Sequence, residues 1–180
     1  AIEQAQETAN LLRSFGAEPI ILPMIQFALL ETARERLEIA LVEINKYDWL
    51  VFTSQNGVRF FDDLIWQIYG KYDSLSFGPP PKIAAVGTKT AAQLKSRGFP
   101  VDLVPDHFVG ECLVKSMGDV SGQRILFLRA KKGRPEIVEM FQERGATVTE
   151  IVLYDTISAD PTPEALVEFN KGVDAILFTS

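Results

Sequence analysis

The feature that most constrains this sequence is a regular alternation between short apolar runs and segments with helical periodicity. Residues 48–53 (DWLVFT) and 124–128 (RILFL) are short and apolar, as the buried strands of parallel sheets are. Apolar side chains then recur at helical spacing over residues 58–68 and 137–141. Strands that alternate with helices in this way are typical of parallel sheets, so the sequence predicts an α/β fold.

Three further extended runs belong to the same pattern. The sequence predicts strands over residues 19–25, 82–86 and 99–104. A segment with helical spacing, residues 90–97, separates the last two of these runs. The alternation of strand and helix therefore continues through the middle of the chain.

Two short similarities within the chain indicate an internal repeat. Residues 11–18 (LLRSFGAE) resemble residues 140–147 (MFQERGAT), and residues 47–54 (YDWLVFTS) resemble residues 173–180 (VDAILFTS). A repeat predicts two related α/β domains. Coincidence has equal weight, because a helix followed by glycine and a strand is common. If the repeat is real, one strand before the first residue and one helix after the last are lacking, and we expect an inactive fragment.

The composition excludes several classes of function. A net charge of −6 gives the chain little attraction for nucleic acid or an anionic membrane, so we expect neither as a partner. The single cysteine, Cys112, cannot form an internal disulfide, which fits a reducing compartment. The single histidine, His107, argues against a metal site and against a Ser-His-Asp triad.

Polar residues gather where the predicted strands end, in residues 53–57, 87–90, 129–133 and 179–180. In parallel α/β sheets, ligands bind beyond these ends, where hydroxyl and backbone N–H groups at helix starts form anion sites. Four basic side chains lie in these loops: Lys89, Arg129, Lys131 and Lys132. They favour a small anionic ligand, such as a polycarboxylate or a phosphate. The alternative is that the loop residues only cap helices and form turns.

Tyr154 is a candidate for chemistry on the ligand. It lies in a long extended run, residues 149–157, which would carry the chain from one domain to the other. The repeat partner of this run, residues 18–27, would be the outward crossing, and the two crossings could pair as an antiparallel linker. A tyrosine there would face the cleft between the domains, where its hydroxyl could donate a hydrogen bond or a proton. A sheet tyrosine that packs on its neighbours is an equal alternative.

Five segments match one known family in their order and spacing. They are residues 11–23 (LLRSFGAEPIILP), 47–61 (YDWLVFTSQNGVRFF), 82–106 (KIAAVGTKTAAQLKSRGFPVDLVPD), 122–156 (GQRILFLRAKKGRPEIVEMFQERGATVTEIVLYDT) and 173–180 (VDAILFTS). With these segments the chain resembles the uroporphyrinogen-III synthases. Members of that family usually begin with a strand and continue well past the second FTS motif. The resemblance therefore also implies a fragment that lacks the first strand and the C-terminal part.

The resemblance implies two similar parallel-sheet α/β domains joined by a two-stranded linker. Residues 1–24 and 157–180 would form the first, discontinuous domain, and residues 31–150 the second. The linker strands would be residues 25–30 and 151–156.

The family's reaction converts hydroxymethylbilane to uroporphyrinogen III, with inversion of ring D and loss of water. The resemblance thus implies a cyclising hydro-lyase of porphyrin and heme biosynthesis that is a cytoplasmic monomer and needs no cofactor and no metal. Tyr154 would be the proton donor. Residues at matching positions would bind the substrate: Ser54, Gln55, Asn56, Gly87, Thr88, Thr90, Arg129, Ala130, Thr179 and Ser180.

Two other functions remain open at this point. One is a non-catalytic ligand-sensing domain of the same fold within a larger regulator, which would bind without turnover. The other is a two-domain sugar- or phosphate-binding protein of similar topology, which would need periplasmic targeting. The residues 1–10 lack the basic start and apolar stretch of a signal peptide.

Overall fold

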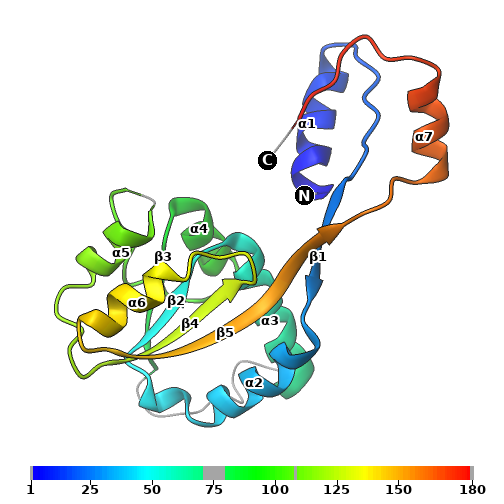
Figure 1. Ribbon diagram of the computed structural model, residues 1–180. Helices are drawn as coiled ribbons and strands as arrows, with labels where there is room; N and C mark the ends of the chain where they lie inside the picture. Colours follow the sequence, from blue (N-terminus) through cyan, green and yellow to red (C-terminus); the bar gives the residue numbers. More distant parts are fainter. Residues whose placement is uncertain (1, 71–79, 108, 179–180) are drawn as a thin grey trace. The chain divides into compact units, whose positions relative to one another are not determined.

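The computed structural model describes residues 2–70, 80–107 and 109–178, and it has a mixed α/β fold (Figure 1). The first half of the chain forms α1 (Ile2–Ser14), β1 (Ile25–Leu29), α2 (Glu31–Val42), a 3-10 turn (Ile44–Lys46), β2 (Trp49–Phe52), α3 (Gln55–Tyr69) and β3 (Lys82–Ala85). The second half forms α4 (Thr88–Ser96), α5 (Gly110–Ser116), β4 (Arg124–Ala130), α6 (Glu136–Glu143), β5 (Thr147–Ser158) and α7 (Pro163–Asn170). The α/β class predicted from the sequence is confirmed.

The chain divides into two compact units. Unit 1 comprises Ala1–Ala28 and Thr156–Ser180, and unit 2 comprises Leu29–Asp155. The helices of unit 1 are α1 and α7, and α7 begins at a capping residue, Thr162, whose hydroxyl accepts the N–H of Ala165. That unit 1 carries a parallel sheet similar to that of unit 2 stays a prediction.

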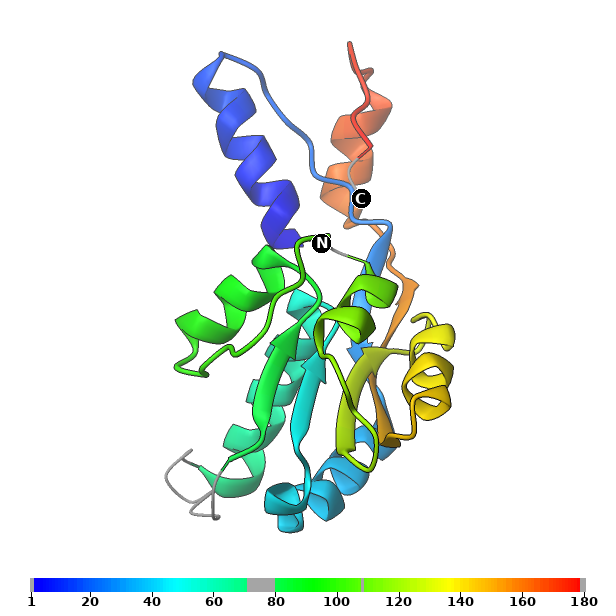
Figure 2. The same cartoon turned by 90° about the vertical axis from the view of Figure 1, so that its left-hand side faces the viewer.

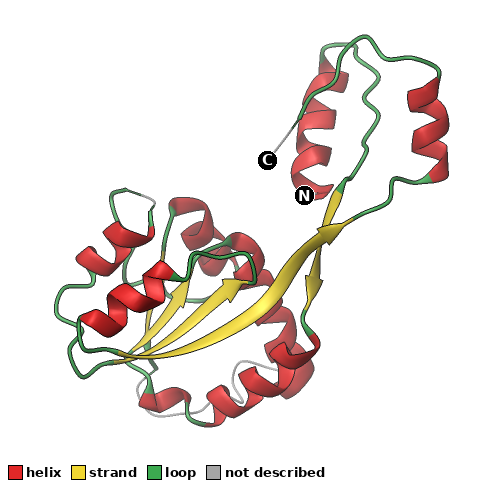
Figure 3. Cartoon of the chain, viewed as in Figure 1, coloured by secondary structure: helices red, strands yellow, loops and turns green. Residues whose placement is uncertain are grey.

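The strands form one sheet in the order β1-β5-β4-β2-β3. The ladders β2–β3, β2–β4 and β4–β5 are parallel, so β2, β3, β4 and β5 point the same way (Figure 3). The carboxyl ends of β2, β3 and β4 therefore meet at one edge of the sheet. Turns and helix starts follow at that edge, which is where an α/β sheet usually binds its ligand.

The strand β1 is bonded to β5 at the other side of the sheet and runs against it. The N–H of Leu30 donates to the carbonyl of Leu153 over 2.9 Å, and the N–H of Ala159 donates to the carbonyl of Met24 over 3.1 Å. Residue numbers rise along one strand as they fall along the other, which is the antiparallel arrangement. Both runs expected as linker strands are thus extended, and their role as a linker between two domains stays a prediction.

Helices of unit 2 cover both faces of its strands (Figure 2). Side chains alternate between the faces along each strand. Trp49, Val51, Ile125 and Phe127 join one core cluster with residues of α5 and α6, among them Leu113, Val114, Ile137 and Phe141. On the opposite face, the ring of Phe52 packs edge-on against Phe61 of α3, with ring centroids 5.1 Å apart. Unit 2 is therefore a three-layer arrangement that fixes the carboxyl edge of its sheet.

Three strand predictions differ from the structure. Residues 17–24 are not in a strand, and the strand begins only at Ile25, because Pro19 and Pro23 have no N–H to give to a ladder. The run 99–104 makes one isolated bridge, Ala84 to Leu103, between Pro100 and Pro105. Residues 173–178 are not in a strand, and Phe178 is 95% exposed there.

An ion pair joins α3 to the residue that ends α4. The guanidinium of Arg97 contacts Oδ2 of Asp62, which is 5% exposed. The other carboxylate oxygen, Oδ1, has no hydrogen-bond partner among the described residues. Burial raises the pKa of Asp62, while the contact with Arg97 places a positive charge beside it. The ion pair thus links the end of α4 to α3.

No helix in the described part of the chain has both the length and the apolar character that crossing a membrane requires.

Candidate functional site

A cavity of about 320 Å³ lies at the carboxyl edge of β2, β3 and β4 in unit 2. Each of these strands contributes to its wall where the strand ends, and α5 and α6 close it from one side. The lining residues are Thr53, Ser54, Val86, Val109, Gly110, Phe127, Arg129, Ala130, Lys132, Gly133, Arg134 and Ile137. Its volume is at the lower end of the range found for small-molecule sites.

A pair of hydroxyl groups adjoins this cavity. The oxygens of Ser54 and Tyr154 are 2.9 Å apart and share a hydrogen bond. Ser54 lines the cavity, whereas Tyr154 is 4% exposed and stacks on the ring of Phe60, with ring centroids 5.1 Å apart. Ser54 thus stands as a link between the Tyr154 hydroxyl and the cavity.

Ser54 is also the residue that caps α3. Its Oγ accepts the N–H of Gly57 over 3.0 Å, which satisfies one of the free donors at the start of the helix. A hydroxyl oxygen can accept two hydrogen bonds and donate one. Either hydroxyl can donate in the Ser54–Tyr154 pair. In the arrangement in which Tyr154 donates, Ser54 keeps its own hydrogen to give toward the cavity.

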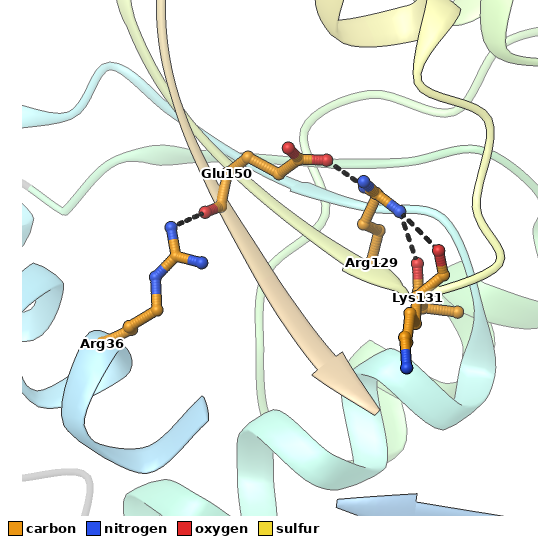
Figure 4. A network of polar contacts seen from close by, with 5 residues as sticks. Arg36, Arg129, Lys131 and Glu150 are labelled. Atoms are coloured by element: carbon orange, nitrogen blue, oxygen red, sulfur yellow. Dashed lines mark hydrogen bonds and ion pairs between the residues drawn. The ribbon is translucent and has the colours of Figure 1, made fainter. Parts of the chain in front are cut away.

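Basic side chains also line the cavity. Arg129 lies near the end of β4, and Lys132 and Arg134 belong to the turn between β4 and α6. The guanidinium of Arg129 contacts the carboxylate of Glu150 on β5, and it also donates to the carbonyls of Ala130 and Lys131 (Figure 4). Lys132 makes no ion pair with the residues that the structure describes, so its charge is available to an anion.

The structure brings together three of the predicted site residues. Ser54, Arg129 and Ala130 line the cavity. Gln55 and Asn56 form the first turn of α3, directly after Ser54. They are half-buried and do not line the cavity.

Three further predicted residues, Gly87, Thr88 and Thr90, do not line the cavity. Gly87 caps α4, Thr88 is exposed in the first turn of that helix, and Thr90 is 5% exposed, inside the packing of α4. Thr179 and Ser180 lie outside the described residues.

Two parts of the site were missed by sequence reasoning. Gly110 contributes to the wall because it packs against Ile137, where a Cβ atom would lie 2.2 Å from the end of the isoleucine side chain. The sequence feature that could have pointed to Gly110 is a glycine at the start of a helix, within an apolar stretch. The contact between Glu150 and Arg129 depends on how β4 and β5 pair, because Phe127 lies opposite Glu150 in that ladder. No pattern in the sequence predicts this pairing register.

Across residues 2–70, 80–107 and 109–178, no cluster of three or more His, Cys, Asp or Glu side chains is arranged to hold a metal ion.

Replacement of the helix cap tests the local structure of the site. We expect Ser54→Ala to lower the free energy of unfolding of unit 2 by about 1 kcal/mol, because the N–H of Gly57 loses its acceptor. Urea denaturation followed by circular dichroism measures this change. The matched control is Ser54→Thr, which keeps the hydroxyl. Equal stability of the alanine and threonine variants would contradict the capping role.

Comparisons with known proteins identify the family. A family model described as uroporphyrinogen-III synthase HemD matches residues 6–180. The chain belongs to the uroporphyrinogen-III synthase family. A uroporphyrinogen-III synthase from Synechococcus elongatus is 32% identical to it over 184 residues, which cover 100% of this chain and 68% of the relative. The porphyrin biosynthesis protein HemD of Ruminiclostridium josui is 29% identical, with 86% of this chain and 30% of that protein covered.

Solved structures of uroporphyrinogen-III synthases share the fold. A mutant enzyme from Thermus thermophilus superposes with a TM-score of 0.61 at 18% identity, and the match covers 95% of this chain and 65% of that chain. A second structure of the Thermus thermophilus enzyme gives a TM-score of 0.56 at 19% identity, with 92% and 63% covered. The chain thus spans about two thirds of the length of these structures.

Proposed function

We propose that the full-length protein is a lyase that cyclises hydroxymethylbilane to uroporphyrinogen III, with inversion of ring D and loss of water. The observation that carries this proposal is the hydroxyl pair Ser54–Tyr154 beside a cavity with basic walls, in a chain of the uroporphyrinogen-III synthase family. The pair offers a proton, and the basic wall offers binding to a carboxylate. Both are needed for a substrate that bears acidic side chains and a leaving hydroxyl.

In the proposed mechanism, Tyr154 is the proton donor and Ser54 delivers the proton. Tyr154 donates to Ser54, whose own hydrogen is directed to the hydroxyl group of the substrate. The carbon–oxygen bond then breaks, and the hydroxyl leaves as water. The electrons come from the pyrrole ring next to that carbon, so the step requires no cofactor. Ring D then forms the new carbon–carbon bond, and the proton released on closure returns to the Ser54–Tyr154 pair.

The basic wall has a positioning role in this proposal. Lys132 would hold a carboxylate of the substrate in the cavity, together with N–H groups of the turn that carries it. Arg134 would assist it, although its guanidinium also lies 3.8 Å from the carboxylate of Glu111. A four-ring substrate is larger than this cavity, so the cavity holds one part of it. When one part of the substrate is held in place, ring D closes the macrocycle with inversion, which gives the III isomer. Without the enzyme, closure gives the I isomer, so the proposed catalysis acts by orientation.

The remaining expectations belong to the same proposal. Residues 1–24 with 157–180 and residues 31–150 would be two similar α/β domains, joined by the strands at 25–30 and 151–156. Gln55, Asn56, Gly87, Thr88, Thr90, Thr179 and Ser180 would contact parts of the substrate that the cavity does not hold. The enzyme would act as a cytoplasmic monomer.

The test is an assay that separates the two isomers of the product. The full-length protein is supplied with hydroxymethylbilane, and the products are oxidised and separated by chromatography. We expect the III isomer to predominate. If only the I isomer accumulates, as in the reaction without enzyme, the proposal is wrong, and saturable binding under those conditions would instead favour a ligand-sensing domain.

A further inference from the structure

We propose that Glu150 is a positioning residue, which holds Arg129 so that this arginine shapes the basic wall of the cavity. The effect of Glu150 on substrate binding rests on the proposed function, whereas its effect on the turn does not. Arg129 was expected from the sequence to bind the substrate. Its contacts point instead to the protein's own backbone, and Glu150 directs it there (Figure 4).

The first step of the argument concerns the turn that Arg129 encloses. Its Nη1 donates to the carbonyl of Ala130 over 2.8 Å and to the carbonyl of Lys131 over 3.0 Å. The N–H of Gly133 donates to the same carbonyl of Ala130 over 3.0 Å, which closes the turn. These hydrogen bonds fix the backbone from which Lys132 projects.

Close packing makes the turn depend on the arginine side chain. A Cβ atom at Gly133 would lie 3.1 Å from Cδ of Arg129 and 3.0 Å from the oxygen of Ala130. A larger residue at this position would crowd the arginine side chain and the carbonyl of Ala130. The side chain of Arg129 is 13% exposed, so the turn and Glu150 together remove most of it from solvent.

Glu150 is itself fixed. Its backbone carbonyl accepts a hydrogen bond of 2.8 Å from Nη2 of Arg36 on α2, and its backbone lies opposite Phe127 in the β4–β5 ladder. Its backbone therefore has a defined position, from which the carboxylate contacts Nε of Arg129. Contact with a carboxylate neutralises the charge of Arg129, which leaves the charge of Lys132 for the ligand.

A second attachment ties the turn to β5. The N–H of Lys131 donates to the carbonyl of Tyr154 over 2.8 Å, and its ammonium group lies 3.0 Å from the carboxylate of Asp155. The start of the turn is thus held twice, by Glu150 through Arg129 and by Tyr154 and Asp155 through Lys131. Loss of Glu150 should loosen the part nearest the cavity and leave the rest of unit 2 folded.

The experiment compares Glu150→Ala with the wild-type full-length protein. We expect the amide of Gly133 to exchange its hydrogen about tenfold faster, the change expected from losing one charge-assisted hydrogen bond. We expect KM for hydroxymethylbilane to rise about tenfold, while kcat changes less than about threefold, because substrate placement is affected and the proton donor is not. Glu150→Gln, which keeps an acceptor oxygen, should recover most of both values.

The matched control is Glu38→Ala. It removes an ion pair of the same kind, between a glutamate oxygen and Nε of Arg34, from the exposed surface of α2. It should change none of these quantities. An unchanged exchange rate at Gly133, or a uniform acceleration throughout unit 2, would overturn the positioning role. If Glu150→Ala does not fold, exchange in Glu150→Met, which fills similar space without an acceptor oxygen, decides the question by the same criterion. Hydrogen exchange needs no substrate, so this test stands even if the wild-type protein makes no III isomer.

Discussion

Tyr154→Phe is expected to lower kcat of the full-length protein by roughly 10²–10⁴-fold, the usual contribution of a general acid. The substitution removes the hydroxyl that shares a hydrogen bond with Ser54. It keeps the ring that stacks on Phe60, so the packing of β5 against α3 is preserved. The expected loss of stability is only about 1 kcal/mol, the contribution of one hydrogen bond.

The measurement is the initial rate of uroporphyrinogen III formation, with thermal unfolding measured in parallel. Tyr47→Phe is the matched control, because it also removes a hydroxyl from a buried tyrosine. Tyr47 precedes β2 and so lies at the opposite edge of the sheet from the cavity. The control should keep the wild-type rate. An unchanged kcat in Tyr154→Phe would remove this tyrosine from the mechanism and leave it as a packing residue of the sheet.

Arg97→Met is expected to lower the free energy of unfolding of unit 2 by about 3–5 kcal/mol. The substitution leaves the carboxylate of Asp62 buried without its ion-pair partner, and its Oδ1 already has no partner among the described residues. Urea denaturation at pH 7 measures the loss. The control is Arg34→Met, which breaks an exposed ion pair on α2 and should cost less than about 0.5 kcal/mol.

The loss in Arg97→Met should depend on pH. Burial raises the pKa of Asp62, and the substitution removes the positive charge that opposes this. The unfolded chain, where an Asp pKa is about 3.9, then releases this proton more readily than the folded chain. Stability therefore falls as the pH rises from about 4 through the folded-state pKa, and the deficit should shrink as the pH is lowered from 7 to 5. A deficit that is constant over this range would argue against the buried charge as its cause.

The sequence predicted the central strands well, because their apolar runs are continuous and bounded by polar turns. The runs expected at 48–53, 82–86 and 124–128 contain β2, β3 and the first part of β4. The runs at 19–25 and 99–104 have similar composition, but residues 19–24 are not in a strand and 99–104 forms only one bridge. A strand needs a neighbour with free N–H and carbonyl groups as well as an apolar run, and proline at these places removes donors.

The candidate site was predictable where it follows from the chemistry of strand ends. Ser54 lies just after the apolar run of β2, and Arg129 lies at the end of the apolar run of β4. Their place at the carboxyl edge could therefore be inferred from topology alone. Glu150 could not be found this way, because it lies within a strand and looks like an ordinary polar residue of a half-buried sheet. Its importance depends on which residue of β4 lies opposite, and pairing register is set by the whole fold.

The attachment of Lys131 to Tyr154 and Asp155 has a consequence for protein engineering. Loops of related enzymes are often exchanged to alter substrate preference, on the assumption that each loop is a separate module. Here the segment between β4 and α6 shares its bonds with a strand that follows α6 in the chain. A chimera must transplant both pieces together, or the grafted loop will lose its anchors and adopt another conformation.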